Sequence, residues 1–168
     1  MSAVQDKFDD LEDWVPRSRR PTRRRRGTAF ADLHGAYHVI NRRVAMELRQ
    51  HGLAPSEAVV LLALRRYPMA TVSIVRQATG LRPSTLDSLL DRLVDREVLE
   101  RASPRDIPRE VVVTVAPRGR LVTEHAVGVL RDVDEELAAF IGTDALTSLE
   151  LVFEAARALG VPGTAPDL

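Results

Sequence analysis

Hydroxyl groups and carboxylates share one predicted helix, which begins in the segment PSTLDSLLDRLVDREVLE at residues 83–100. Ser84, Thr85 and Ser88 carry hydroxyls, which can donate to and accept from the edges of DNA bases. The same segment holds three carboxylates, whose charges repel phosphates, at intervals of one helical turn: Asp87, Asp91 and Asp95. Its chemistry therefore depends on which set faces a partner.

Apolar residues fix how this helix must be oriented. They form one stripe that faces the core, made of Leu86, Leu89, Leu90, Leu93 and Val94. Asp87 and Asp91 then lie on one flank, and Thr85, Arg92 and Arg96 on the other. In a helix-turn-helix, the N-terminal residues of the second helix meet the bases. The candidate DNA contacts in this region are therefore Arg82, Ser84, Thr85, Asp87, Ser88 and Arg92.

The aspartates have several possible roles. Asp87 could accept a hydrogen bond from a cytosine amino group, penalise non-specific binding, or simply be solvated, and the sequence does not decide between these. We expect Asp91 to form an ion pair and Asp95 to be a solvated charge. The arginines considered as partners are Arg76, Arg118 and Arg120.

Breaking residues and hydrophobic periods predict the elements around this helix. A long helix is expected from Thr28 to Gly52, a second from Pro55 to Pro68, and a short third from Thr71 to Gly80. The runs VLERA and EVVVTV, joined by SPRDIPR, predict a β-hairpin. Two further helices follow, at 117–141 and 143–159. This order predicts a mainly α fold with a small β-hairpin wing, the winged helix-turn-helix.

Composition excludes several classes of protein. The 168 residues suffice for one domain and a tail, and the lack of cysteine excludes disulfides and thiolate metal sites. No glycine-rich phosphate loop or catalytic serine or histidine setting is present, so we do not expect an enzyme or a cofactor. No apolar run is long enough to span a membrane and no secretory signal is visible, so we expect a cytoplasmic protein.

The net charge of zero hides a segregation of charge along the chain. Residues 1–26 hold 8 basic and 5 acidic side chains, and residues 54–120 hold 11 and 8. The remaining residues, 27–53 and 121–168, hold 5 and 11. Such a pattern is typical of a protein with one face that meets a polyanion, although charges can also scatter this way by chance.

Over residues 28–160 the chain resembles the multiple-antibiotic-resistance regulator (MarR) family. The segments LAPSEAVVLLAL, LRPSTLDSLLDRLVDREVLER and VVVTVAPRGR occur in the family's order and spacing. The resemblance implies a homodimer built from the N- and C-terminal helices that binds a palindromic operator. Many such proteins release DNA when an aromatic or phenolic compound binds between the dimer helices and the DNA-binding lobe.

The chain departs from the family at the wing. Where the family carries Asp-Arg, this sequence reads Pro108, Arg109, Glu110, so Arg109 carries over, and Arg105 with Asp106 is a possible substitute. Ser88 stands where the family often has an arginine. Glu97 replaces the glycine that usually ends the recognition helix, the second helix of the helix-turn-helix. Seven arginines at 17–26 could compensate by contacting DNA as an arm, or could be solvated or screened by the acidic start of the tail. The arm residues considered are Arg23, Arg24, Arg25 and Arg26.

Candidate effector contacts lie in the tail and the first helix. They are Trp14, His34, Tyr37, His38 and Arg42. Trp14 could instead dock the tail on the body. His34 and His38 have the spacing of a metal pair, which His125 or Glu124 would have to complete, but we do not predict a metal site.

The sequence thus predicts three parts. Residues 1–27 form a flexible extension, acidic and then arginine-rich, and residues 161–168 form a C-terminal tail. In the domain at 28–160, residues 54–120 make the winged helix-turn-helix, and 28–53 and 117–160 the dimerisation helices. The predicted function is a ligand-responsive, homodimeric repressor that binds operator DNA. The alternative is a winged-helix dimer that acts as a protein interaction module with weakened DNA binding.

Overall fold

The computed structural model describes residues 28–102 and 111–159, which fall into two units, divided after Ala36. In the first unit, the Thr28 hydroxyl accepts a hydrogen bond from the amide of Ala31 at 3.2 Å. This confirms the predicted N-cap of helix α2, Ala29–Leu48. The rings of Phe30 and His34 stack within this unit, with centroids 6.0 Å apart. The remainder of the fold belongs to the second unit.

The second unit begins inside α2, which ends earlier than predicted. A 3-10 turn, Arg49–His51, follows Leu48, and Gly52 ends it in the left-handed region at a φ of 64°. Arg43 ties α2 to a later helix, because it pairs with Glu47 and, at 3.0 Å, with Glu136. The hydrogen bond to Glu47, together with the charge of Glu136, raises the pKa of Arg43 above its ordinary value.

Three helices follow with the predicted boundaries: α3 at Pro55–Arg66, α4 at Val72–Thr79 and α5 at Pro83–Asp95. Proline at the first position starts α3 and α5, where no amide hydrogen is needed. The Thr71 hydroxyl caps α4 by accepting from the Ile74 amide at 3.3 Å. Gly80 ends α4 at a φ of 66°, and this left-handed turn leads into α5.

The wing is a three-stranded antiparallel sheet in the order β1-β3-β2. β2 spans Leu99–Ala102, β3 spans Val112–Val115, and residues 103–110 between them lie outside the described residues. The prediction of a two-stranded hairpin was therefore incomplete. The missing strand is β1, Ala70–Thr71, in which Ala70 pairs with Val113. Two residues carry no alternating pattern, so only the tertiary pairing reveals this strand.

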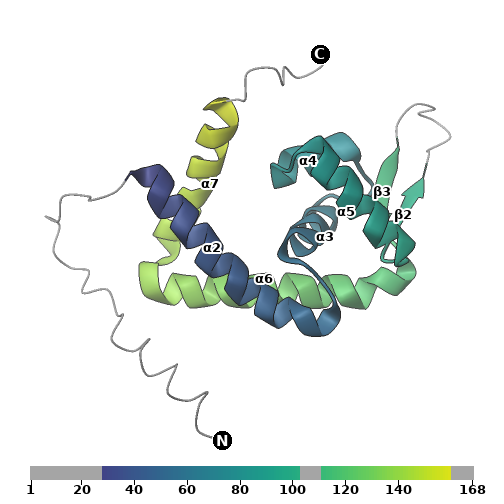
Figure 1. The fold of residues 1–168 in the computed structure, drawn as a ribbon, viewed down its shortest axis with the longest axis horizontal. Helices are drawn as coiled ribbons and strands as arrows, with labels where there is room; N and C mark the ends of the chain where they lie inside the picture. Colours follow the sequence, from purple (N-terminus) through teal and green to yellow (C-terminus); the bar gives the residue numbers. More distant parts are fainter. Residues whose placement is uncertain (1–27, 103–110, 160–168) are drawn as a thin grey trace, which may run out of the picture. The chain divides into compact units, whose positions relative to one another are not determined.

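A 3-10 turn, Pro117–Gly119, precedes the long helix α6, Arg120–Ile141, so Pro117 opens a turn rather than the α-helix itself. Gly119 lies directly on the backbone of Val98, where a Cβ atom would stand 2.0 Å from the carbonyl oxygen. Gly142 then separates α6 from α7, Thr143–Leu159. Within this unit α6 runs alongside α3, and β2 lies beside α5 (Figure 1).

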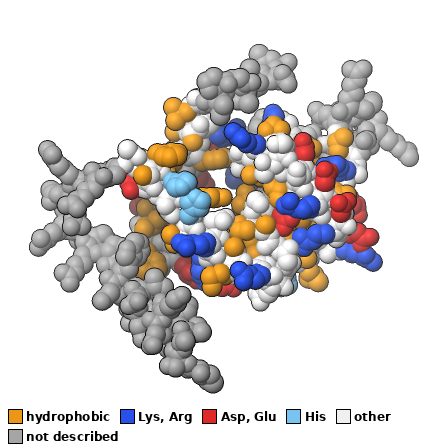
Figure 2. All heavy atoms as spheres, viewed as in Figure 1, with side chains coloured by type: hydrophobic (Ala, Val, Ile, Leu, Met, Phe, Trp, Pro, Cys, Tyr) orange, Lys and Arg blue, Asp and Glu red, His pale blue; other side chains and the backbone are white. Residues whose placement is uncertain are grey.

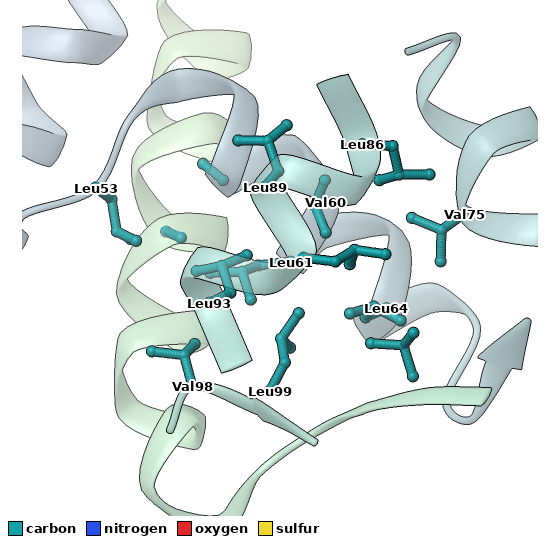
Figure 3. Packing of buried hydrophobic residues seen from close by; sticks show 14 of the residues in the cluster. Leu53, Val60, Leu61, Leu64, Val75, Leu86, Leu89, Leu93, Val98 and Leu99 are labelled. Atoms are coloured by element: carbon teal, nitrogen blue, oxygen red, sulfur yellow. The ribbon is translucent and has the colours of Figure 1, made fainter. Parts of the chain in front are cut away.

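The core lies where α3, α4 and α5 meet the sheet and α6. The leucines predicted to face it are buried, and Val94 is partly buried against them. Figure 3 shows leucines of α5 pointing toward Val60, Leu61 and Leu64 of α3. This packing fixes the rotation of α5 about its axis, and therefore which of its residues reach solvent. None of the helices in the described ranges is long and apolar enough to cross a membrane.

Candidate nucleic-acid interface

The outer face of α5 carries the hydroxyl groups that the sequence singled out. Ser84, Thr85 and Ser88 are all exposed, as predicted from the leucine stripe. The Ser88 hydroxyl donates to the carbonyl oxygen of Ser84 at 2.9 Å. Because its hydrogen is used within the helix, its lone pairs remain available to accept from a base amino group. Arg82 is exposed at the N-cap of the same helix.

The acidic flank of α5 faces the wing. Asp91 forms an ion pair with Arg101 of β2 at 2.8 Å. The predicted ion pair exists, but the partners considered for it were wrong, because Arg118 instead pairs with Glu97. Arg101 lies opposite α5 because of the way the strands pair. The spacing of residues within the helix could not predict this position. This pair neutralises one of the carboxylates that would otherwise repel phosphates.

Two further acidic residues of α5 point to solvent. Asp87 and Asp95 are exposed, which agrees with the interpretation of Asp95 as a surface charge. Figure 2 shows acidic and basic side chains intermixed over the surface formed by α5 and the strands. The role of Asp87 is not decided by its exposure.

The basic flank of α5 faces the start of α3, where Glu57 is buried with 4% of its surface exposed. One carboxylate oxygen lies 3.4 Å from Nε of Arg92, and the other lies 3.6 Å from Arg96. The second oxygen also accepts a hydrogen bond from the Ala54 amide at 2.8 Å. Glu57 was not among the residues predicted from the sequence. The signal that could have found it is an acid at the third position of a helix that Pro55 starts.

Glu97 stands where the MarR family usually has a glycine, and the structure shows which backbone conformation that position takes. Its backbone is left-handed, with a φ of 57°, directly after Arg96, the C-cap of α5. Glycine adopts this conformation without strain, whereas a residue with a side chain costs about 1–2 kcal/mol. The structure thus keeps the turn and places a strained glutamate in it.

Several predicted site residues lie outside the described residues, and their assignments stay predictions. They are Trp14, Arg23, Arg24, Arg25, Arg26, Arg105 and Arg109, together with Pro108 and Glu110.

The candidate effector residues of α2 are exposed. The rings of Tyr37 and His38 meet edge to face at 5.4 Å, and Arg42 is also exposed. The residues considered for completing a metal site have other partners, since His125 stacks on His51 at 4.5 Å and Glu124 pairs with Arg65. The described ranges contain no group of three or more side chains that could hold a metal ion.

A cavity of about 600 Å³ lies between α7 and the helices α3 and α4. Sequence reasoning did not find it, because its walls come from three separated segments. The Phe153 ring of α7 stands in it and approaches the helix-turn-helix, where a Cβ atom on Gly80 would lie 3.1 Å from the ring. The cavity is lined by Val59, Leu62, Ala63, Arg66, Tyr67, Ile74, Gln77, Ala78, Glu150, Phe153, Glu154 and Arg157.

Comparisons with known proteins identify the fold. No family model and no curated protein matches the sequence. Among solved structures, BpsR of Bordetella bronchiseptica, whose DNA binding is regulated by 6-hydroxynicotinic acid, is 21% identical with a TM-score of 0.64. That alignment covers 76% of this chain and 97% of BpsR.

Two other structures extend this likeness. A mutant of MarR from E. coli in complex with operator DNA is 20% identical, with a TM-score of 0.64, and the alignment covers 76% of this chain and 91% of that one. The organohalide-sensing RdhR regulator bound to 2,4-dichlorophenol is 15% identical, with a TM-score of 0.67 and 82% of each chain covered. At these identities the likeness is one of fold. The chain therefore has the winged helix-turn-helix fold of the MarR-type transcriptional regulators.

Proposed function

We propose that this protein is a DNA-binding transcriptional regulator that reads sequence with the N-terminal half of α5. The observation that carries the proposal is the set of exposed hydroxyls on that half, held outward by a buried leucine stripe. Ser84, Thr85 and Ser88 are short and can approach a base edge closely. Operator DNA bound to the similar MarR mutant supports this assignment.

We further propose that the regulator is a homodimer, joined through α7 and the end of α6. α7 contains no buried residue, although Leu151, Val152 and Leu159 are apolar and at least 41% exposed. Phe140 and Ile141 at the end of α6 are also exposed. Exposed apolar side chains gathered on these two elements favour burial against a second copy. Two copies would bring two reading helices to a palindromic operator.

A small aromatic effector is the third part of the proposal. The cavity beside Phe153 has a volume typical of ligand sites and combines aromatic and aliphatic walls with charged groups. The aromatic acid and the phenol named for two similar regulators support an aromatic effector for this cavity. The cavity is lined by residues of both α7 and α4. A ligand bound there would therefore change the position of the helix-turn-helix relative to α7. Release of DNA in response would make the protein a ligand-responsive repressor.

The predicted basic arm and wing remain part of this proposal. Arginines 23–26 would contact the DNA backbone or a minor groove, and Arg105 or Arg109 would serve at the wing tip. They would add phosphate contacts to an α5 surface that carries Asp87 and Asp95.

The alternative is a winged-helix dimer that binds a protein rather than DNA. The observation that favours it is the exposure of Asp87, Asp95 and Glu97 on or beside the reading helix. Selection of bound duplexes from random DNA separates the two functions. A regulator enriches one palindromic sequence and loses affinity steeply with salt. Enrichment of no sequence would support the interaction module.

Ser88→Ala tests the reading role of α5 directly. We expect it to change the preferred base at one position of each half-site, with a smaller change in affinity for other sequences, because a base contact is lost. The measurement is a repeated selection from random DNA, followed by fluorescence anisotropy on the enriched duplexes. Ser148→Ala on α7 is the control for the loss of such a hydroxyl, since Ser148 also donates to the carbonyl four residues earlier at 2.9 Å, and sedimentation equilibrium shows whether it retains the dimer. A uniform loss over all sequences would contradict the reading role.

The effector site is tested by filling the cavity. We expect 6-hydroxynicotinic acid or 2,4-dichlorophenol to raise the melting temperature, by an amount equivalent to about 2.7 kcal/mol at a concentration 100 times Kd. Ala78→Trp should abolish this shift because it occupies the space beside Phe153. Ser73→Trp lies on the same helix outside the cavity lining and serves as the control. A shift that survives Ala78→Trp would place the ligand elsewhere.

A further inference from the structure

We propose that Glu57 is a positioning residue for DNA binding, which holds Arg92 of α5 so that its terminal amino groups meet a DNA phosphate. This inference rests on the proposed function and adds a residue from α3 to the reading surface. Glu57 itself would not touch DNA.

The burial of Glu57 calls for a reason. In the described ranges it is the one charged residue that is buried, with 4% of its surface exposed. A carboxylate removed from water is unfavourable unless charges and hydrogen bonds compensate it. An apolar side chain would pack at this position without that penalty. The carboxylate is therefore explained by what it binds.

Both oxygens of Glu57 are used, and in different ways. One accepts from the Ala54 amide at 2.8 Å and lies 3.6 Å from Arg96, which closes the N-terminus of α3. The other accepts from Nε of Arg92 at 3.4 Å. The same side chain therefore fixes the start of α3 and the direction of an arginine on the reading helix.

Arg92 is held by only part of its guanidinium group. Its Nε–H points to Glu57, while its side chain is 57% exposed to solvent. A guanidinium has five N–H donors in a rigid plane, so a bond made through Nε leaves the donors of the terminal amino groups for another acceptor. Such a fork matches the oxygens of a phosphate. Anchoring at Nε removes rotational freedom that phosphate binding would otherwise have to restrict.

The position of Arg92 on α5 matches this role. It follows Thr85 by seven residues and Ser88 by four, so all three lie on neighbouring parts of one face. Thr85 and Arg92 are separated by roughly 10 Å along the axis. When the hydroxyls reach the bases, Arg92 therefore faces the flanking backbone.

The balance of charge favours the same conclusion. On the side of α3, one carboxylate meets the two arginines Arg92 and Arg96, which leaves an excess of one positive charge. On the side of the wing, Asp91 and Arg101 neutralise each other. Among these ion pairs the unbalanced positive charge thus lies on the flank that carries Arg92, while Asp87 and Asp95 are exposed elsewhere on the helix.

A double-mutant cycle tests the assignment. Affinity of the full chain for the selected duplex and for a random duplex is measured by anisotropy at several salt concentrations. We expect Arg92→Ala to weaken binding to both duplexes about tenfold and to reduce the salt slope by about 0.9 per protomer, the value for one phosphate. Glu57→Gln keeps an oxygen for the Ala54 amide but loses the charge that orients Arg92, and should weaken binding several-fold.

The decisive comparison is the effect of Glu57→Gln in the Arg92→Ala background. No further loss there is expected, because Glu57 acts through Arg92. Additive losses in the double mutant, or tighter DNA binding by Glu57→Gln alone, would overturn the assignment. Specific DNA binding by the wild type would leave the proposed function intact in either case. Failure of the wild type to bind any duplex would overturn both.

Two other variants guard against a merely structural effect. Glu124→Gln removes a carboxylate from an exposed ion pair with Arg65, away from α5, and should leave DNA affinity unchanged. Arg92→Lys leaves Glu57 in place. It therefore tests whether an oriented guanidinium is needed for DNA binding, even if Glu57→Gln is too unstable to be measured. We expect it to keep the salt slope but to bind several-fold more weakly, since lysine lacks the planar fork. Binding equal to the wild type by Arg92→Lys would refute the role of a fixed guanidinium.

Discussion

Gly119→Ala is expected to lower the free energy of unfolding by about 3 kcal/mol, at the upper end of the range for overpacking. The added Cβ atom would stand 2.0 Å from the carbonyl oxygen of Val98. That oxygen also accepts a hydrogen bond from Ala116 at 3.0 Å, so backbone on both sides of the contact would have to move. Because β2 begins at Leu99 and α6 at Arg120, the wing and the long helix would both be displaced.

Gly128→Ala is the matched control for this experiment. Gly128 lies inside α6, and a Cβ atom there would meet nothing within 4 Å. We expect alanine to stabilise the helix by about 0.5–1 kcal/mol, because it restricts the unfolded chain. Urea denaturation of both variants at one fixed protein concentration gives the two changes. Equal midpoints for Gly119→Ala and the wild type would show that the contact at Val98 yields easily.

Leu151→Glu is expected to separate the proposed dimer and to weaken binding to a palindromic duplex on the order of 100-fold. Leu151 is 72% exposed on α7, and a charge there would have to be buried when two copies meet. A monomer would bind one half-site and lose the gain in effective concentration that links the two reading helices. Sedimentation equilibrium and anisotropy on the same sample measure both effects.

Leu121→Glu controls for the loss of an exposed leucine as such. Leu121 is 74% exposed at the start of α6, away from the end that leads into α7. We expect it to leave assembly and DNA affinity unchanged. Dissociation by Leu121→Glu but not by Leu151→Glu would move the proposed interface to the other end of α6.

Helices were predictable from the sequence because their signals are local. Pro55, Thr71, Gly80 and Pro83 each start or end a helix where a cap or a fixed backbone angle is required. The orientation of α5 also followed from its leucines, since a stripe can be buried in only one way. Exposure of the serines therefore matched the prediction.

The interactions that join elements could not be predicted in this way. Arg101 meets Asp91 only because the sheet places β2 beside α5, and Glu57 meets Arg92 across 35 residues of sequence. β1 was missed because two residues have no period of their own. Each of these contacts joins segments that are brought together by packing. The residue pattern within one segment therefore could not predict them.

The turn at Gly80 is restrained twice. Its φ of 66° disfavours most side chains, and the Phe153 ring leaves 3.1 Å for any Cβ atom. Asparagine, which tolerates the left-handed backbone, would still meet the ring. A side chain at position 80 therefore requires both a strained backbone and a displaced Phe153 ring, so a smaller residue at 153 should make such a change easier to accept.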